Sequence, residues 1–126
     1  MSYVGKKVLV VDDEKDLCEI VSFELEDIGF SVKTAHNGSD AFTMVKDQGD
    51  FDLVISDVRM TGGDGIELLE NIKKYDAKKP PVILMTGFAD VTEDEVLEKG
   101  AIAIIAKPIS FSELRSSIDK ALATLR

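Results

Sequence analysis

Cysteine is almost absent from this sequence, and so is any long apolar segment. Cys18 is the one cysteine among 126 residues, which excludes an intrachain disulfide framework and a metal site built from several cysteines. No apolar run reaches the length of a membrane-spanning helix, and residues 1–5 lack the apolar core of a signal peptide. We therefore expect a soluble protein of the cytoplasm that has no membrane partner.

Positive charge is also scarce. The chain has 15 Lys and Arg against 24 Asp and Glu, a net charge of −9, and residues 12–28 hold eight of the acids and one lysine. A domain this acidic repels the phosphates of nucleic acids, so we expect no direct binding of DNA or RNA by this domain. Apolar residues make up 44% and charged residues 31%, which indicates a folded chain with a core. The length predicts one domain, residues 1–126.

The apolar pattern alternates regularly between short strand-like runs and helical spacing. Short apolar runs predict strands at residues 8–11, 51–56, 82–86 and 101–106, and a weaker pattern of alternation predicts one at 31–35. Helical spacing predicts helices at residues 17–28, 41–49, 66–75, 91–97 and 111–125, and the expected core face of the first is Leu17, Ile20, Val21, Leu25 and Ile28. Such alternation predicts an α/β fold, a doubly wound parallel sheet with helices on both faces. An eight-stranded barrel needs about 250 residues, so the sheet is open.

Polar side chains follow four of these predicted strands where each strand ends. Asp12 and Asp13 follow the first strand, Asp57 the third, Thr86 the fourth and Lys107 the fifth. Each residue alone has an ordinary explanation, such as a turn, a helix cap or a solvated side chain. Open parallel sheets, however, bind ligands at the carboxyl ends of their strands, where all five side chains converge.

The chemistry of this cluster points to phosphate. Asp12 or Asp13 together with Asp57 offers the hard oxygen ligands that suit Mg²⁺, and crowded carboxylates repel one another unless a cation is present. The Lys107 ammonium and the Thr86 hydroxyl are suited to phosphoryl oxygens. A metal, a cation, a hydroxyl donor and a central carboxylate are the groups that phosphoryl transfer to aspartate requires.

Five motifs together resemble the receiver domain of two-component response regulators over essentially the whole chain. They are VLVVDDE at 8–14, LVISDVRM at 53–60, GDG at 63–65, LMTG at 84–87 and IAKP at 105–108. The resemblance implies a flavodoxin-like, five-stranded parallel sheet of strand order 2-1-3-4-5 with five helices. It also implies a signalling switch rather than an enzyme acting on other molecules, because such domains catalyse only their own phosphoryl transfer and dephosphorylation.

The resemblance implies a role for each site residue. Asp57 matches the phosphoacceptor, which takes a phosphoryl group from a sensor histidine kinase or a histidine phosphotransfer protein. Asp12 and Asp13 match the acid pair that holds Mg²⁺ with Asp57 and the backbone carbonyl of Arg59. Lys107 matches the lysine that contacts the phosphoryl group.

The resemblance also assigns the switch. Thr86 matches the hydroxyl that moves toward the phosphoryl group, and the Lys107–Pro108 bond is expected to be cis. The signalling surface is the one formed by the fourth helix, the fifth strand and the fifth helix. Downstream, the resemblance leaves open an unknown output protein or a covalently linked effector domain.

Several positions depart from the resemblance or lie outside it. Thr61 stands where the family often has proline, which predicts a more flexible loop, and Ile104 replaces a common aromatic residue, which puts the usual coupling to Thr86 in question. His36 has no partner at metal-ligand spacing, so we expect a surface residue. Cys18 is expected to be a small buried apolar group rather than a reactive thiol.

Two other functions fit an α/β chain with acidic strand ends less well. A phosphatase of the haloacid-dehalogenase type needs Asp-x-Asp after its first strand, whereas Asp12 and Asp13 are adjacent. A flavodoxin-like FMN carrier needs a phosphate-binding loop there, and these acids repel phosphate.

The acids of residues 14–27 have two possible roles, selection of the histidine-bearing partner or simple solubility.

Overall fold

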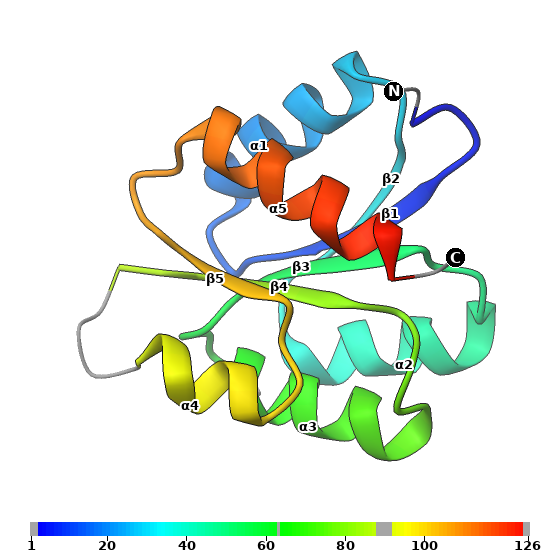
Figure 1. Cartoon of the computed structure of the whole chain (residues 1–126), viewed down its shortest axis with the longest axis vertical. Coiled ribbons are helices and arrows are strands. Elements are labelled where there is room, and N and C mark those ends of the chain that lie inside the picture. Colours follow the sequence, from blue (N-terminus) through cyan, green and yellow to red (C-terminus); the bar gives the residue numbers. More distant parts are fainter. Residues whose placement is uncertain (1–2, 63, 88–91, 125–126) are drawn as a thin grey trace.

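The computed structural model describes residues 3–62, 64–87 and 92–124. Within them, five strands alternate with five helices, as the sequence predicts (Figure 1). In chain order the elements are β1 (Lys7–Val11), α1 (Lys15–Asp27), β2 (Ser31–Ala35), α2 (Gly38–Gln48), β3 (Leu53–Asp57), α3 (Gly65–Tyr75), β4 (Val82–Thr86), α4 (Glu93–Glu98), β5 (Ala103–Ala106) and α5 (Phe111–Ala123). Among the described residues, none of these helices has the length and hydropathy needed to cross a bilayer.

The sheet is wholly parallel and has the order β2-β1-β3-β4-β5. This confirms the predicted fold class, the strand order and the five helices. The order reverses between β1 and β3, which are direct neighbours although β2 separates them in the chain. The carboxyl ends of β1 and β3 therefore lie side by side at the switch point where open α/β sheets bind ligands.

Helices cover both faces of the sheet, α1 and α5 on one and α2, α3 and α4 on the other (Figure 1). Side chains alternate along each strand, so Val8 and Val10 belong to the core cluster on the α1 side, and Leu9 and Val11 to the cluster on the α2 side. All four are fully buried. Burial on both faces explains why β1, β3 and β4 carry apolar runs, whereas β2, at the edge of the sheet, is mostly exposed and includes Ser31, Lys33 and Thr34.

Some predicted boundaries and one predicted core residue are wrong. β5 begins at Ala103 rather than at residue 101, and the predicted ends at residues 91 and 125 lie outside the described residues. Ile20 was expected in the core, but 54% of its surface is exposed, beside Phe23 at 69%. Val21, predicted for the same core face, is buried. Because adjacent residues of a helix point about 100° apart, Ile20 lies outside the buried stripe of α1.

The segment before β1 is anchored by Tyr3. This side chain is 1% exposed, and its ring stacks on Phe30 with centroids 5.0 Å apart. The Tyr3 hydroxyl donates a hydrogen bond to Asp119 of α5 and accepts one from Nε of Arg115 at 3.4 Å. Burial raises the pKa of Tyr3, the hydrogen bond to Asp119 raises it further, and Arg115 acts in the opposite direction. The N-terminal segment is thus joined to α5 by a partly buried polar contact.

We predict that Tyr3→Phe lowers the free energy of unfolding by about 1 kcal/mol near neutral pH, because the hydrogen bonds with Asp119 and Arg115 are lost. The raised pKa means that the unfolded chain ionises this tyrosine first as pH rises. The wild type should therefore lose more stability than Tyr3→Phe as pH rises through about pH 10, the ordinary tyrosine pKa, and above it. Urea unfolding followed by circular dichroism measures both values, and equal losses in the two proteins would contradict the prediction.

Candidate functional site

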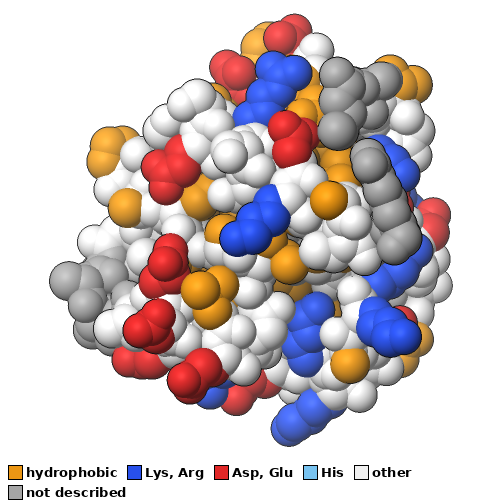
Figure 2. Space-filling model, viewed as in Figure 1, with side chains coloured by type: hydrophobic (Ala, Val, Ile, Leu, Met, Phe, Trp, Pro, Cys, Tyr) orange, Lys and Arg blue, Asp and Glu red, His pale blue; other side chains and the backbone are white. Residues whose placement is uncertain are grey.

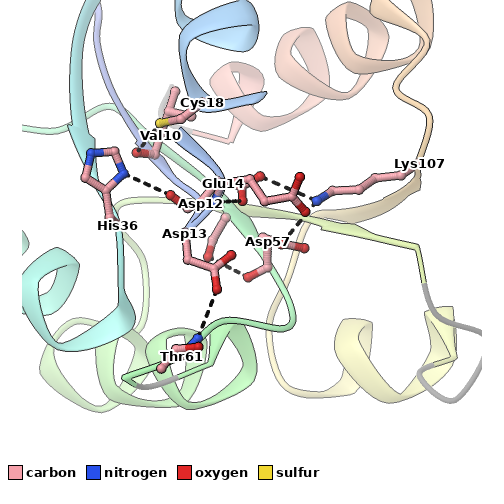
Figure 3. A network of polar contacts seen from close by, with 10 residues as sticks. Val10, Asp12, Asp13, Glu14, Cys18, His36, Asp57, Thr61 and Lys107 are labelled. Carbon is pink, nitrogen blue, oxygen red and sulfur yellow. Dashed lines mark hydrogen bonds and ion pairs between the residues drawn. The ribbon is translucent and has the colours of Figure 1, made fainter. Parts of the chain in front are cut away.

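The carboxyl ends of β1, β3 and β5 bring together two carboxylates and an ammonium group (Figure 3). Nζ of Lys107 lies 3.1 Å from Oδ2 of Asp57 and 3.4 Å from Oδ2 of Asp12. Asp12 is fully buried and Asp57 is 4% exposed. Lys107 therefore bridges two buried acids that lie 45 residues apart in the chain.

Asp13 completes the cluster from its exposed side. Asp12, Asp13 and Asp57 each offer a carboxylate oxygen, and these oxygens all lie within 4.8 Å of one another. The sequence alone allowed either Asp12 or Asp13 beside Asp57, whereas the structure brings both there. Three hard oxygen ligands at this spacing fit a divalent cation such as Mg²⁺, which keeps several waters and takes few protein ligands.

Main-chain contacts hold Asp12 in place. Its Oδ1 accepts a hydrogen bond from the amide of Glu14 at 2.9 Å, and its own amide donates to the carbonyl of Ala35 at 3.1 Å. His36 is exposed, as expected, but its Nδ1 lies 3.0 Å from the Asp12 carbonyl oxygen. Because a carbonyl only accepts, Nδ1 carries the hydrogen. The sequence could not predict this contact from the spacing of His36 to other polar side chains, because the partner of His36 is a main-chain oxygen.

The loop after β3 forms the mouth of the site. The amide of Thr61 donates to Oδ2 of Asp13 at 3.1 Å. A cavity of about 370 Å³ opens here, lined by Asp13, Arg59, Met60, Thr61 and Asp64. Arg59 thus lines the same cavity as Asp13, and the part of its carbonyl in metal binding stays a prediction.

Burial and charge act on the central pair in opposite directions. Burial raises the pKa of Asp57, the Lys107 hydrogen bond and charge lower it in part, and the charge of Asp12 raises it again. For Lys107, burial lowers the pKa, but the hydrogen bond with Asp57 and the charges of Asp57 and Asp12 outweigh it, so the pKa is raised. The ammonium form is favoured, and the buried acids hold more negative charge than Lys107 alone offsets. A metal cation would supply the rest.

Thr86 and Lys107 are joined through the main chain. Thr86 is the last residue of β4 and is buried, and its carbonyl accepts from the amide of Lys107 at 2.8 Å. The Lys107–Pro108 bond is cis, as the resemblance implied. Ile104 pairs with Leu84 in the sheet and is half-buried against the core cluster on the α2 side. Thr86 and Ile104, the two positions that the resemblance connects with switching, therefore lie on the neighbouring strands β4 and β5.

Cys18 is a packing residue, as predicted. It is 1% exposed, and its thiol contacts the carbonyl of Val10 with a separation of 3.8 Å. Burial, aided by the charge of Asp12, raises its pKa to about 11, although a contact with Ser22 acts the other way. The thiol is therefore protonated at neutral pH and takes no part in the chemistry of the acidic cluster.

Gly65 lets α3 begin directly against the end of β3. Its amide donates to the carbonyl of Val58 at 2.8 Å. A Cβ atom at this position would overlap the carbonyl oxygen of Asp57 and lie 3.1 Å from Cα of Val58. Only glycine fits such a close approach of two backbones. Of the motif at 63–65, residue 63 lies outside the described residues.

We predict that Gly65→Ala destabilises the fold by about 3 kcal/mol or more, because an overpacked methyl group here meets main chain that has no rotamer to change. Gly87→Ala is the matched control. Among the described residues, a Cβ there meets only the Lys107 Cβ at 3.9 Å, so a change below about 1 kcal/mol is expected. Urea unfolding of both variants measures the difference, and equal stability would contradict the proposed close approach.

Comparison with known proteins agrees with this geometry. Residues 8–119 match the family described as the response regulator receiver domain. The chain is 40% identical over 120 residues to the transcriptional regulatory protein ZraR of Salmonella typhimurium, which covers 94% of the chain and 27% of ZraR. The chain therefore spans about a quarter of the length of the curated relatives it matches.

Solved receiver structures superpose closely on the chain. The receiver domain of the Francisella response regulator 1452 has a TM-score of 0.87 and 27% identity, covering 97% of this chain and 100% of that one. The response regulator TrrA of Thermotoga maritima, solved in complex with Mg²⁺ and BeF, has a TM-score of 0.84 and 33% identity, covering 93% and 99%. These matches favour the receiver over the phosphatase and the FMN carrier.

Proposed function

Because this chain belongs to the response regulator receiver family, we propose that Asp57 accepts a phosphoryl group from a phosphohistidine. The donor is a sensor histidine kinase or a histidine phosphotransfer protein. The observation that carries the proposal is the acidic cluster itself, in which three carboxylates with oxygens within 4.8 Å meet Lys107 at the switch point of the sheet. This arrangement is built to hold a metal ion and a phosphoryl group together.

The proposed reaction is an in-line displacement. A carboxylate oxygen of Asp57 attacks phosphorus, the bond from phosphorus to the histidine nitrogen breaks, and the electron pair returns to the imidazole. Asp12, Asp13, Asp57 and the Arg59 carbonyl would hold Mg²⁺, which neutralises charge on the phosphoryl oxygens. Lys107, now 3.1 Å from Asp57, would pair with a phosphoryl oxygen. The Thr86 hydroxyl would donate to another.

We predict that incubation with Mg²⁺ and a small phosphodonor adds one phosphoryl group, and that Asp57→Ala abolishes the addition. The reason is that Asp57 lies closer to the Lys107 ammonium than Asp12 does, 3.1 Å against 3.4 Å, and that Oδ1 of Asp12 already accepts from the Glu14 amide. Intact-mass spectrometry measures the adduct, and chelation of the metal is the second arm of the experiment. An adduct on the Asp57→Ala protein, or none on the wild type, would contradict the assignment.

The signalling surface is proposed to be that of α4, β5 and α5. Figure 2 looks onto this face, and acidic side chains gather over α4 at its lower left. Between the helices the surface is partly apolar, with Leu97 40% exposed and Ile104 half-buried. Ile104 is aliphatic and has no ring to turn inward. We therefore propose that Thr86 alone couples phosphorylation of Asp57 to a change at β5.

The kinase is proposed to dock on α1. The exposed Ile20 and Phe23 lie on this helix among acidic side chains, with Glu19 and Glu24 next to them in the chain. An exposed aromatic residue within a charged rim is typical of a protein interface rather than of a solvated helix face. The matching partner surface is an apolar groove with basic residues at its edge.

We predict that the double variant Glu19→Lys/Glu24→Lys slows phosphotransfer from the cognate kinase about fivefold, because rim charges govern encounter with an oppositely charged partner. Phosphorylation by a small donor should be unchanged, since neither glutamate belongs to the acidic cluster. The rates of phosphotransfer are measured with radiolabelled, phosphorylated kinase as the donor and with the wild type and the double variant as acceptors.

The control for this prediction is Asp47→Lys, a charge reversal on α2 at the opposite face of the sheet. It should leave the kinase rate as it is. A kinase rate in the double variant that matched the control would assign the acids of α1 to solubility alone.

We further propose that residues 1–126 form one receiver unit working in the cytoplasm. The relatives are about four times longer, which favours a receiver linked to an effector domain over a stand-alone regulator. In that arrangement DNA binding would belong to the linked domain, because the net charge of −9 opposes direct contact between this unit and nucleic acid.

A further inference from the structure

The three carboxylates of the acidic cluster are held unequally. Both oxygens of Asp12 have partners, the Glu14 amide at 2.9 Å and Lys107 at 3.4 Å, and Asp57 pairs with Lys107 at 3.1 Å. Asp13 is exposed, and among the contacts of the described residues its carboxylate has one partner, the Thr61 amide (Figure 3). The orientation of Asp13 therefore depends on a single main-chain donor.

Without that donor, electrostatics would turn Asp13 away. Its oxygen lies within 4.8 Å of oxygens from Asp12 and Asp57, and like charges at such distances repel. An exposed side chain relieves the repulsion by rotating into water. The Thr61 amide opposes this rotation by binding one oxygen, Oδ2, and it leaves the other free, because a carboxylate accepts through both.

The Thr61 amide is itself well placed to serve as a fixed donor. The next residue, Gly62, has a φ of +82°, and a Cβ there would lie 3.3 Å from the Cβ of Asn37, so the loop packs against the start of α2. Asp64 then caps α3 by accepting from the Glu67 amide at 2.8 Å. The loop is thus anchored beyond Thr61 on two elements, and its donor exists because this residue is not proline.

We infer that the backbone amide of Thr61 is a positioning group for the metal site, which holds the Asp13 carboxylate in the orientation that binds Mg²⁺. The amide does not touch the metal. It reduces the cost of assembling three like charges before the cation arrives, in the way that preorganised ligands raise affinity. The inference rests on the Mg²⁺ site of the proposed function and adds the residue that sets its affinity.

The test compares Thr61→Pro, which removes the amide hydrogen, with Thr61→Ala, which keeps it and removes only the side chain. Mg²⁺ binding is measured by isothermal titration calorimetry on the unphosphorylated protein. Thr61→Pro should bind Mg²⁺ about fivefold more weakly than the wild type, a difference of about 1 kcal/mol. Thr61→Ala should retain most of the wild-type affinity for Mg²⁺. A purely structural role of the threonine side chain would not allow this.

A second measurement does not depend on how proline affects the loop. In the metal-free wild type, the Thr61 amide proton should show the downfield shift and slow exchange of a bonded donor, and Asp13→Ala should remove both. Wild-type affinity in Thr61→Pro, equal losses in both Thr61 variants, or a Thr61 amide indifferent to Asp13→Ala would each overturn the inference alone. A wild type that bound no Mg²⁺ would overturn the proposed function with it.

Discussion

The ammonium group of Lys107, placed between the carboxylates of Asp12 and Asp57, is the interaction on which the functional edge of this molecule depends. Two acids with almost no exposure to water are tolerated only when a cation is near. Lys107 satisfies part of this demand from β5, across the whole width of β3 and β4. A shortfall in positive charge remains, and it is this charge that the proposed metal ion would supply.

The architecture makes this cluster possible. A parallel sheet directs the carboxyl ends of all its strands to one edge, and the order β2-β1-β3-β4-β5 places β1 beside β3 there. Helices on both faces enclose the strands in apolar cores, so Asp12, Asp57 and Thr86 stand at the ends of the buried strands β1, β3 and β4. The loops that follow add contacts to these acids, from the Thr61 amide to Asp13 and from the His36 ring to the Asp12 carbonyl.

Much of this organisation was predictable from neighbouring residues. The five strands and five helices follow from periodicity, and Asp12, Asp57, Thr86 and Lys107 stand at strand ends because local pattern locates those ends. Ile20 shows where such prediction fails, because an apolar residue one position from the buried stripe is indistinguishable in sequence from one on it. Tyr3 shows the same at the N-terminus, where its burial depends on Phe30, Arg115 and Asp119.

The sequence by itself determined which elements form, that the sheet is buried on both faces, and which polar residues end its strands. These properties are encoded within a few adjacent residues, where hydrophobic period and side-chain type act directly. Only the tertiary structure decided how closely the three carboxylates approach one another, that Thr61 donates to Asp13, and that His36 contacts the Asp12 carbonyl. Those contacts join main-chain and side-chain atoms of different loops, and the paths of the loops are set once the helices have packed on the sheet.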